Sequence, residues 1–299
     1  MREAVFAGSF YPKDKTALSS MIDNFFNKVD GKINKNDIKS NTIKNNSKNI
    51  NDFISAIAPH AGYIYSGQTA AYTYKNIYDF LKYKPIDTFI IIGPNHTGIG
   101  RPISVSMDDW KTPLGIIRND KEFSTTLVKS SKYIEEDETA HKEEHSIEVQ
   151  LPFLQKIVND PKSVFICMGD QSYESALILS QAIYDTAKIL KRKIFLIASS
   201  DMNHYEPAEV AKNKDMKVLD KLKSLDIKGF YSALDETGDS MCGYGTAATA
   251  ALFSKKENAN IGILLNYTNS GEATHDFESV VSYASMGFYN IINSENKNK

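Results

Sequence analysis

The sequence uses little cysteine and has no long hydrophobic run. Its 299 residues include two cysteines, Cys167 and Cys242, too few for the disulfide framework of a small secreted domain and typical of a reducing compartment. The first residues contain no extended apolar stretch of the kind that forms a secretory signal. No segment approaches the roughly 18 consecutive apolar residues of a membrane-spanning helix. We therefore expect a cytoplasmic location and no membrane partner.

An excess of one charge is also missing. The chain has 35 basic and 37 acidic residues, which gives a formal net charge of −2 at pH 7. Nucleic acids and anionic membranes bind surfaces with a concentrated positive charge, so this balance favours neither partner. The sequence also has no phosphate-binding loop and no dinucleotide fingerprint. We expect a small-molecule or peptide substrate and no nucleic-acid partner.

Short apolar runs alternate with amphipathic segments along most of the chain. Hydrophobic residues make up 41% and charged residues 24% of the sequence, as in an ordinary globular domain. Buried strands that alternate with helices indicate a sheet covered on both faces. We predict a single α/β domain over residues 1–299, with a mostly parallel or mixed central sheet flanked by helices. The expected strands are 53–58, 87–92, 103–107, 163–168, 193–199, 261–267 and 280–288, and the expected helices are 15–29, 69–81, 144–157, 174–190, 207–222 and 245–253.

Two segments differ from this alternating pattern. Residues 30–51 are rich in asparagine, lysine, serine and aspartate and can bury little apolar surface, which predicts an exposed, mobile insert. The last residues, 294–299, are polar, and we expect a frayed tail there.

Reactive side chains follow several of the expected strands. His60 follows the first expected strand, and His96 follows the second. Asp201 and His204 come directly after the expected strand that ends at Ser199. In open α/β sheets, ligands bind beyond the carboxyl ends of the strands, so these side chains are expected to converge at one edge. Asp201 and His204 are candidates for supporting a ligand or for acid/base chemistry, because imidazole titrates near neutral pH.

Cys242 precedes the helix expected at 245–253. The positive end of a helix dipole stabilises a thiolate, the form of cysteine that binds metals or attacks electrophiles. Together with His60 and His96, Cys242 would form a set of two imidazoles and one thiolate, which suits iron, copper or zinc better than magnesium or calcium. Three protein ligands leave a coordination position open for water or substrate.

The same residues also have ordinary structural explanations. A histidine in a loop is often only solvated, and a cysteine is often a small buried hydrophobic side chain, which is how we interpret Cys167. Asp201 and His204 can equally form a capping turn before the next helix. The similar settings of His60 and His96, each on a glycine- and proline-containing turn after a strand, favour a shared site.

One short motif indicates a different chemistry. Residues 141–145 match the H-x-x-E-H pattern of inverted zinc proteases, with His141 and His145 four positions apart. The surrounding residues are strongly polar, so we interpret the segment as the exposed start of the helix expected at 144–157. His145 can still face the shared pocket.

Several blocks of the sequence, in order, resemble the Memo family, the B component of the AmmeMemoRadiSam grouping. The resemblance covers nearly the whole chain. The blocks are Ala7-Gly8-Ser9-Phe10-Tyr11-Pro12, Ala58-Pro59-His60-Ala61-Gly62-Tyr63, Gly93-Pro94-Asn95-His96, Glu144-His145-Ser146-Ile147-Glu148, Ser200-Asp201-Met202-Asn203-His204, Met241-Cys242-Gly243 and Tyr267-Thr268-Asn269-Ser270-Gly271.

The resemblance implies a fold like that of the class III extradiol dioxygenases, which use non-haem iron. It implies that His60, His96 and Cys242 face a metal, and that Asp201 and His204 line the same pocket. His204 would occupy the place of the catalytic histidine of the dioxygenases. Those enzymes bind iron through two histidines and a carboxylate, whereas Cys242 takes the place of the carboxylate here. A soft thiolate changes the metal preference and weighs against simple ring cleavage.

These observations lead to one main hypothesis and three alternatives. The main hypothesis is a metal-dependent redox enzyme that uses Fe(II) or Cu rather than Zn, with His204 as acid/base, Asp201 orienting it, and His145 as a further catalytic candidate. The alternatives are a peptide- or protein-binding module with a vestigial pocket, a metal-free enzyme with Cys242 as nucleophile, and a zinc protease. The family name adds radical-SAM and Amme-type proteins as expected partners.

Overall fold

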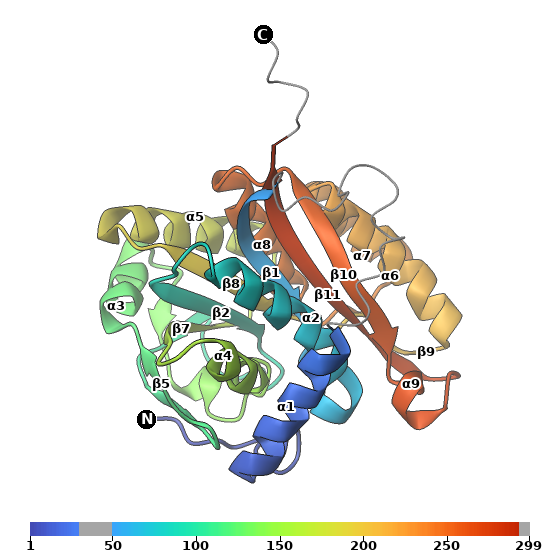
Figure 1. Ribbon diagram of the computed structural model, residues 1–299. Coiled ribbons are helices and arrows are strands. Elements are labelled where there is room, and N and C mark those ends of the chain that lie inside the picture. The colour runs from blue at the N-terminus through green and yellow to red at the C-terminus, as the bar shows by residue number, and fades with distance from the viewer. Residues whose placement is uncertain (30–49, 293–299) are drawn as a thin grey trace.

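The structure is a computed structural model that describes residues 1–29 and 50–292 (Figure 1). Its centre is a mixed sheet with the strand order β10-β11-β1-β8-β2-β7-β3-β6. The four central strands, β1, β8, β2 and β7, are parallel to one another, and β11 and β3 continue the sheet antiparallel on either side. The predicted α/β fold with a mixed sheet is therefore confirmed. The strands are β1 (Ile50–Ala58), β2 (Thr88–Pro94), β3 (Ile103–Ser106), β4 (Trp110–Thr112), β5 (Gly115–Asn119), β6 (Glu135–Glu136), β7 (Lys162–Met168), β8 (Ile194–Ser199), β9 (His204–Glu206), β10 (Ile261–Asn269) and β11 (Val280–Ile291).

Helices cover both faces of the sheet, and each face has its own hydrophobic core. Successive side chains of a strand point to opposite faces, so Phe89 and Ile91 of β2 enter one core while Ile90 and Ile92 enter the other. The first core lies under α1 (Lys15–Val29), α2 (Tyr63–Leu81) and α4 (Leu151–Ile157). The second lies under α3 (Lys121–Ser130), α5 (Tyr173–Leu190), α6 (Ala208–Lys223), α7 (Ile227–Thr237) and α8 (Tyr244–Lys256). The shorter helices are η1 (Thr139–His141), η2 (Glu148–Gln150) and α9 (Gly271–Thr274). Among the helices of the described ranges, none has the length and apolar character to cross a membrane.

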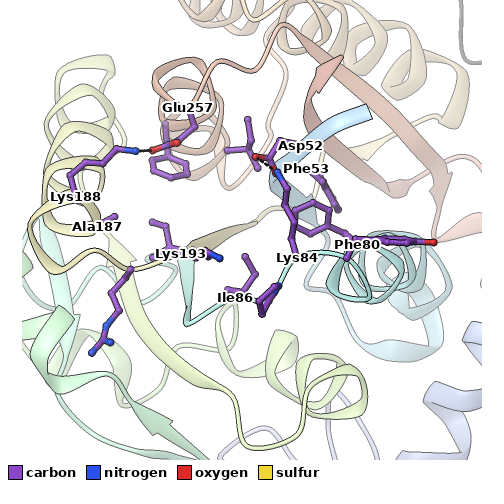
Figure 2. Close-up of a pocket in the computed structure, with 15 residues that line it drawn as sticks. Asp52, Phe53, Phe80, Lys84, Ile86, Ala187, Lys188, Lys193 and Glu257 are labelled. Carbon is purple, nitrogen blue, oxygen red and sulfur yellow. Dashed lines mark ion pairs between the residues drawn. The ribbon is translucent and has the colours of Figure 1, made fainter. Parts of the chain in front are cut away.

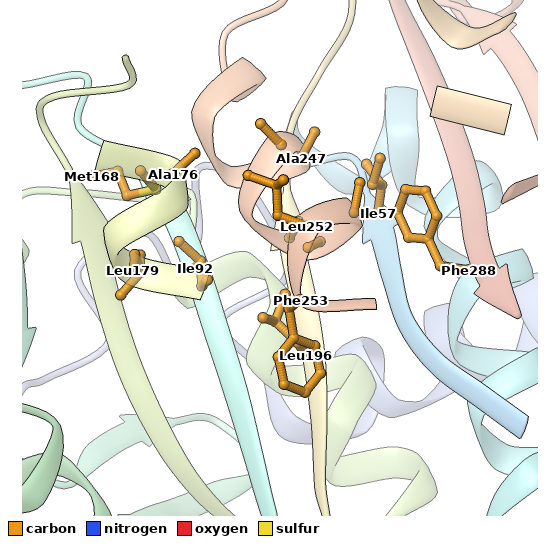
Figure 3. Packing of buried hydrophobic residues seen from close by; sticks show 14 of the residues in the cluster. Ile57, Ile92, Met168, Ala176, Leu179, Leu196, Ala247, Leu252, Phe253 and Phe288 are labelled. Atoms are coloured by element: carbon orange, nitrogen blue, oxygen red, sulfur yellow. The ribbon is translucent and has the colours of Figure 1, made fainter. Parts of the chain in front are cut away.

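Helix α8 packs directly on the parallel centre of the sheet. Its alanines Ala247, Ala248, Ala250 and Ala251 are fully buried, and small side chains allow a helix to approach its neighbours closely. Figure 3 shows Leu252 and Phe253 of α8 beside Leu196 of β8. At Gly243, which precedes α8, an added Cβ would lie 2.4 Å from the carbonyl oxygen of Ser199. The start of α8 is therefore held against the carboxyl end of β8.

The expected elements are present with some corrected boundaries. The helix at 15–29 and the seven expected strands are confirmed within a few residues, whereas α2 begins at Tyr63 rather than at residue 69. Residues Ile50 and Asn51, which we assigned to the insert, belong to β1. The rest of the expected insert, 30–49, and the expected tail at 294–299 lie outside the described residues.

The continuous helix expected at 144–157 is wrong at its start. Residues 144–147 form a turn, followed by η2 and the short helix α4. The Glu144 carboxylate accepts hydrogen bonds from the backbone N–H of Ser146 (2.8 Å) and from that of His96 (2.6 Å). These bonds tie the turn to the end of β2. Glu144 is fully buried, so the segment is not the exposed helix start that its polar composition indicated.

A second buried carboxylate, Glu148, fixes the N-terminal segment to the domain. Glu148 is fully buried and pairs with the guanidinium of Arg2. It also accepts hydrogen bonds from the backbone N–H of Val5 (3.2 Å) and Phe6 (2.9 Å) and from the hydroxyl of Tyr11. We call residues 2–11 the N-terminal hook, because these bonds hold both of its ends to one side chain.

We predict that Glu148→Gln strongly destabilises the protein. The substitution leaves the buried guanidinium of Arg2 without a counter-ion, which typically costs about 3–5 kcal/mol. The free energy of unfolding, measured by urea denaturation, should fall by about this amount. Glu143→Gln, on an exposed side chain of the preceding turn, is the matched control and should leave the stability unchanged. Equal stability of the two variants would contradict this role of Glu148.

Candidate metal centre

Three elements bring His60, His96 and Cys242 together at the carboxyl edge of the parallel strands. His60 follows β1, His96 follows β2, and Cys242 lies two residues before α8. One ligand atom from each of the three side chains lies within 4.8 Å of the other two. His60 Nε2 is 3.1 Å from Cys242 Sγ. The structure thus groups the three predicted ligands in a geometry that could hold one metal ion.

The ring of His60 is oriented by a buried hydroxyl. Ser199 Oγ donates its only hydrogen to the carbonyl oxygen of Ser146 (2.6 Å) and accepts from the side-chain amide of Gln150 (2.7 Å). It therefore accepts from His60 Nδ1, 2.9 Å away, and this assigns the ring proton to Nδ1. The lone pair on Nε2 then faces Cys242. Burial, and next the charge of His96, hold the pKa of His60 well below 6.5, which keeps the ring neutral, as a metal ligand must be.

The ring of His96 is oriented by Glu144. His96 Nδ1 lies 2.9 Å from Glu144 Oε1. Burial alone would raise the pKa of Glu144, but the hydrogen bond and the charge of His96 outweigh burial and lower it to about 2. When the His96 ring is neutral, the ionised carboxylate accepts the Nδ1 proton, and Nε2 keeps its lone pair. A carboxylate that orients a histidine in this way is a common support for metal-binding imidazoles.

Cys242 completes the group, and its sulfur atom is contacted by the chain that follows β8. The backbone N–H of Asp201 points at Sγ from 3.3 Å, and Ser200 Oγ is 4.0 Å away. Burial, and then the negative charge of Asp201, raise the pKa of the Cys242 thiol above its ordinary value. A metal cation would reverse this preference because it binds the thiolate and displaces the proton. Two Nε2 lone pairs and one thiolate fit a transition metal.

His145 lies beside this group, on the turn that also carries Glu144. Its ring stacks on that of His96 with a centroid separation of 4.5 Å. Phe10 of the N-terminal hook covers the His145 ring at 4.6 Å, and Phe6 lies 5.6 Å away. His96, Glu144 and His145 also form a set with ligand atoms within 4.8 Å of one another. Burial, and next the charge of His60, lower the pKa of His145 to about 3.

His141 does not join the site. Its ring is fully buried and lies 5.7 Å from that of Trp110, in edge contact. No helix connects it with His145, because η1 ends at His141 and a turn follows. The H-x-x-E-H pattern therefore does not form the shared helical face that an inverted zinc protease needs.

Asp201 and His204 lie near the group in different ways. Asp201 Oδ1 accepts the backbone N–H of His60 (2.7 Å) and of Ala61 (3.3 Å), so it fixes the turn after β1 and does not cap a helix. His204 lies on β9, and its backbone N–H donates to Ser240 Oγ at 2.8 Å. Its buried Nδ1 has no hydrogen-bond partner within residues 1–29 and 50–292. Between the described side chains of Asp201 and His204 no hydrogen bond is formed, so Asp201 does not orient His204 through such a bond.

Comparison with known proteins now identifies the family. The family model described as Memo-like protein matches residues 2–287. The chain belongs to the Memo-like protein family. Relatives include MEMO1 family proteins from three archaea. The chain is 38% identical over 287 residues to that of Methanosarcina barkeri, which covers 96% of this chain and 99% of the relative. It is 37% identical over 289 residues to that of Methanopyrus kandleri, with 96% and 98% covered. It is 40% identical over 290 residues to that of Desulfurococcus amylolyticus, with 96% and 99% covered.

A solved structure with a similar fold is that of an uncharacterized protein from Escherichia coli K12. It superimposes with a TM-score of 0.53 at 11% sequence identity, and the alignment covers 79% of this chain and 99% of that chain. At this identity the likeness shows the fold alone.

The structure adds a carboxyl pair, one fully buried and one partly buried, that the sequence of this Memo-like chain did not indicate. Asp215 of α6 is fully buried and accepts the backbone N–H of Asn203 (3.1 Å) and the hydroxyl of Tyr267 (2.6 Å). Asp239 lies against it, and Asp239 Oδ1 accepts the backbone N–H of Met241 at 2.9 Å. The pair therefore connects the chain before His204 with the chain before Cys242. Burial, and then Asp215, raise the pKa of Asp239 to about 8.

This raised pKa predicts a pH-dependent cost that Asp239→Asn removes. Folded Asp239 holds its proton up to about pH 8, whereas the unfolded residue loses it near its ordinary value of 3.8. Stability should therefore fall as the pH rises between these values, by up to about 1.4 kcal/mol per pH unit. The full shift corresponds to about 5–6 kcal/mol, and screening by solvent reduces it because Asp239 is only partly buried. Asp239→Asn should therefore lack this slope and exceed the wild type by about 2–4 kcal/mol at pH 8, with little difference near pH 4.

Urea denaturation at several pH values in the presence of a chelator measures both slopes. Asp235→Asn, an exposed carboxylate on the same stretch of chain, is the control and should keep the wild-type slope. Parallel stability curves for the wild type and Asp239→Asn would contradict the raised pKa of Asp239.

Proposed function

We propose that this protein is a metal-dependent redox enzyme with Fe(II) or Cu bound by His60, His96 and Cys242. The observation that carries the proposal is that both histidines are held through Nδ1, which leaves Nε2 as the ligand atom, while ligand atoms of His60, His96 and Cys242 lie within 4.8 Å of one another. A thiolate ligand favours iron or copper chemistry over the hard cations. A three-ligand set leaves a position for a substrate. When bound, the metal would supply electron transfer to or from a small oxidisable substrate or a peptide.

The surrounding residues have separate tasks in this proposal. His204 is the acid/base residue of this proposal. His145 is a further candidate beside the group, but its pKa of about 3 keeps the ring neutral near pH 7, so it would accept a proton only transiently. Asp201 acts through the backbone of His60 and is a positioning residue. Phe6 and Phe10 of the N-terminal hook pack on His145 and exclude water from that side.

A binding module for a peptide or a partner protein is the second candidate. It is favoured by an open groove of about 840 Å³ that reaches Cys242 and is lined by Tyr173, Tyr231 and Tyr244, among others. Tyrosines provide large, amphipathic contact area for protein recognition. Radical-SAM and Amme-type proteins, and a cytoplasmic location, remain part of this proposal through the family name and the sparse use of cysteine.

A metal-free cysteine nucleophile is less well supported. The Cys242–His60 distance of 3.1 Å suits such a pair. However, burial raises the pKa of the Cys242 thiol, whereas a nucleophilic cysteine needs a lowered pKa to be reactive near neutral pH. A zinc protease is not supported, since His141 lies away from the site.

Metal content tests the proposal directly. Protein purified without oxygen should contain close to one equivalent of iron or copper by elemental analysis, and Cys242→Ser and His96→Ala should lose it. Cys167→Ala, which alters a buried cysteine outside the group, is the matched thiol control and should retain the metal. If folded wild-type protein neither contains nor takes up iron, copper or zinc, the binding module becomes the better proposal.

Glu144→Gln tests whether the support of His96 matters for metal binding. The substitution removes the negative charge that accepts the Nδ1 proton, and loss of such a support typically weakens metal affinity by about 10- to 100-fold. Competition with a chromophoric chelator measures the affinity, and circular dichroism checks that the variant is folded. The exposed neighbour variant Glu143→Gln should bind as the wild type. Unchanged affinity in Glu144→Gln would separate the carboxylate from metal binding.

A further inference from the structure

A second cavity lies at the opposite edge of the sheet from the candidate metal centre (Figure 2). It is lined by the first residues of β1 and β8 and by Ile86, which precedes β2. The other ends of these three strands lead to His60, Asp201 and His96. A six-residue strand such as β8 spans about 20 Å, so the cavity is separate from the metal centre. Its volume of about 350 Å³ is at the lower end of the range for small-molecule sites.

The inner wall of this cavity is apolar and largely aromatic. Phe80, Ile86 and Ile194 are partly exposed there, and the Phe80 ring meets that of Phe53 edge to face at 5.8 Å. Phe53 and Phe253 are almost fully buried and support this wall from within. Tyr83, at 81% exposure, is a large aromatic side chain left open to solvent. The apolar lining residues include Phe53, Ile54, Phe80, Ile86, Ile194 and Phe253, with Pro85 and Ala187 beside them. Such a wall suits the body of a small planar ligand.

The rim of the cavity is basic. It includes four basic residues, Lys84, Lys188, Arg192 and Lys193, and two acidic ones, Asp52 and Glu257. Both acidic side chains already have partners. Lys84 Nζ lies 2.9 Å from Asp52, and Lys188 Nζ lies 2.8 Å from Glu257 (Figure 2). Arg192 pairs outside the rim, with Glu122 at 2.7 Å.

Lys193 is the one rim cation whose side chain forms no ion pair within the part of the chain that the structure describes. Its backbone N–H donates to Asp87 at 2.8 Å, which fixes the position of the residue. In Figure 2 its side chain ends in the open middle of the ring of lining residues, below the two ion pairs of the rim. A ligand with one negative charge would therefore find a single unpaired cation beside an aromatic wall.

Helix dipoles explain only part of this basic rim. Helices α2, α5 and α8 end at this edge of the sheet, and basic side chains near helix C-termini are stabilised by the carbonyl ends. Lys188 lies in the last turn of α5 and fits this explanation. Lys193 lies outside every helix, directly before β8, so its exposed charge is available to a ligand.

We propose that this cavity binds a small aromatic carboxylate, with the ring against Phe80 and Ile86 and the carboxylate at Lys193. Three features favour a monoanion that contains one aromatic ring or two fused rings. They are the size of the cavity, the aromatic wall and the single unpaired cation. The proposal does not depend on the chemistry of the metal centre.

Calorimetric titration of the full chain with naphthoate, in the presence of a chelator, tests the proposal. Naphthalenemethanol, which has the same rings without the charge, is the paired ligand and should bind at least tenfold more weakly. Lys193→Gln should weaken naphthoate binding about tenfold, equivalent to about 1.4 kcal/mol. Lys212→Gln, an exposed lysine of α6 outside the cavity, should leave it unchanged. Ala187→Leu, which fills the cavity from α5, should reduce the affinity for both ligands.

Three results would overturn the proposal. These are no naphthoate binding by the wild type, equal affinities for the acid and the alcohol, and undiminished naphthoate binding by Lys193→Gln. His60→Ala locates the site independently. It should bind naphthoate as the wild type does, and loss of binding in this variant would place the ligand at the metal centre instead. Failure of this proposal would leave the metal-content test of the redox proposal untouched.

Discussion

The carboxylate of Glu144 supports both histidines of the candidate metal centre. It accepts the ring N–H and the backbone N–H of His96, and it closes the turn to Ser146. Ser146 in turn provides the carbonyl oxygen that takes the hydrogen of Ser199, and this bond decides which ring nitrogen of His60 carries a proton. The buried charge of Glu144 thus sets the orientation of the His60 and His96 rings, which follow two different strands. Buried polar networks of this kind stabilise a single arrangement only when every member has a partner.

The network constrains the neighbouring backbone as well. At Gly93 of β2 an added Cβ would lie 2.2 Å from Ser146 Oγ and 2.9 Å from the side chain of Ile147, so the turn can approach the strand only where no side chain intervenes. Glu148, in the 3-10 helix that follows, then holds the N-terminal hook against the same region. Two buried carboxylates close in sequence therefore anchor segments that are far apart in the chain.

The sequence predicted both the fold and the grouping of His60, His96 and Cys242, because both follow from local patterns. The amphipathic spacing predicted the full extent of α1, and apolar runs marked the central strands. The rule that ligands gather at the carboxyl ends of parallel strands predicted that His60 and His96 lie close together. Helices α3 and α7 were missed, although Asp120, Asp226 and Gly238 provide ordinary capping signals at their ends.

The supporting residues could not be predicted in the same way. Glu144 lies in a polar stretch, and its burial results from contact with the end of β2, which is distant in sequence. The pairing of Asp215 with Asp239 likewise exists only after α6 packs against the chain before Cys242. The three candidate ligands share this long-range character, since long stretches of chain separate His60, His96 and Cys242. An ion held by all three would close large loops and so act as a crosslink, lowering the conformational entropy of any partly unfolded state that still retained it. Resistance to unfolding would then vary with the supply of free metal around the protein.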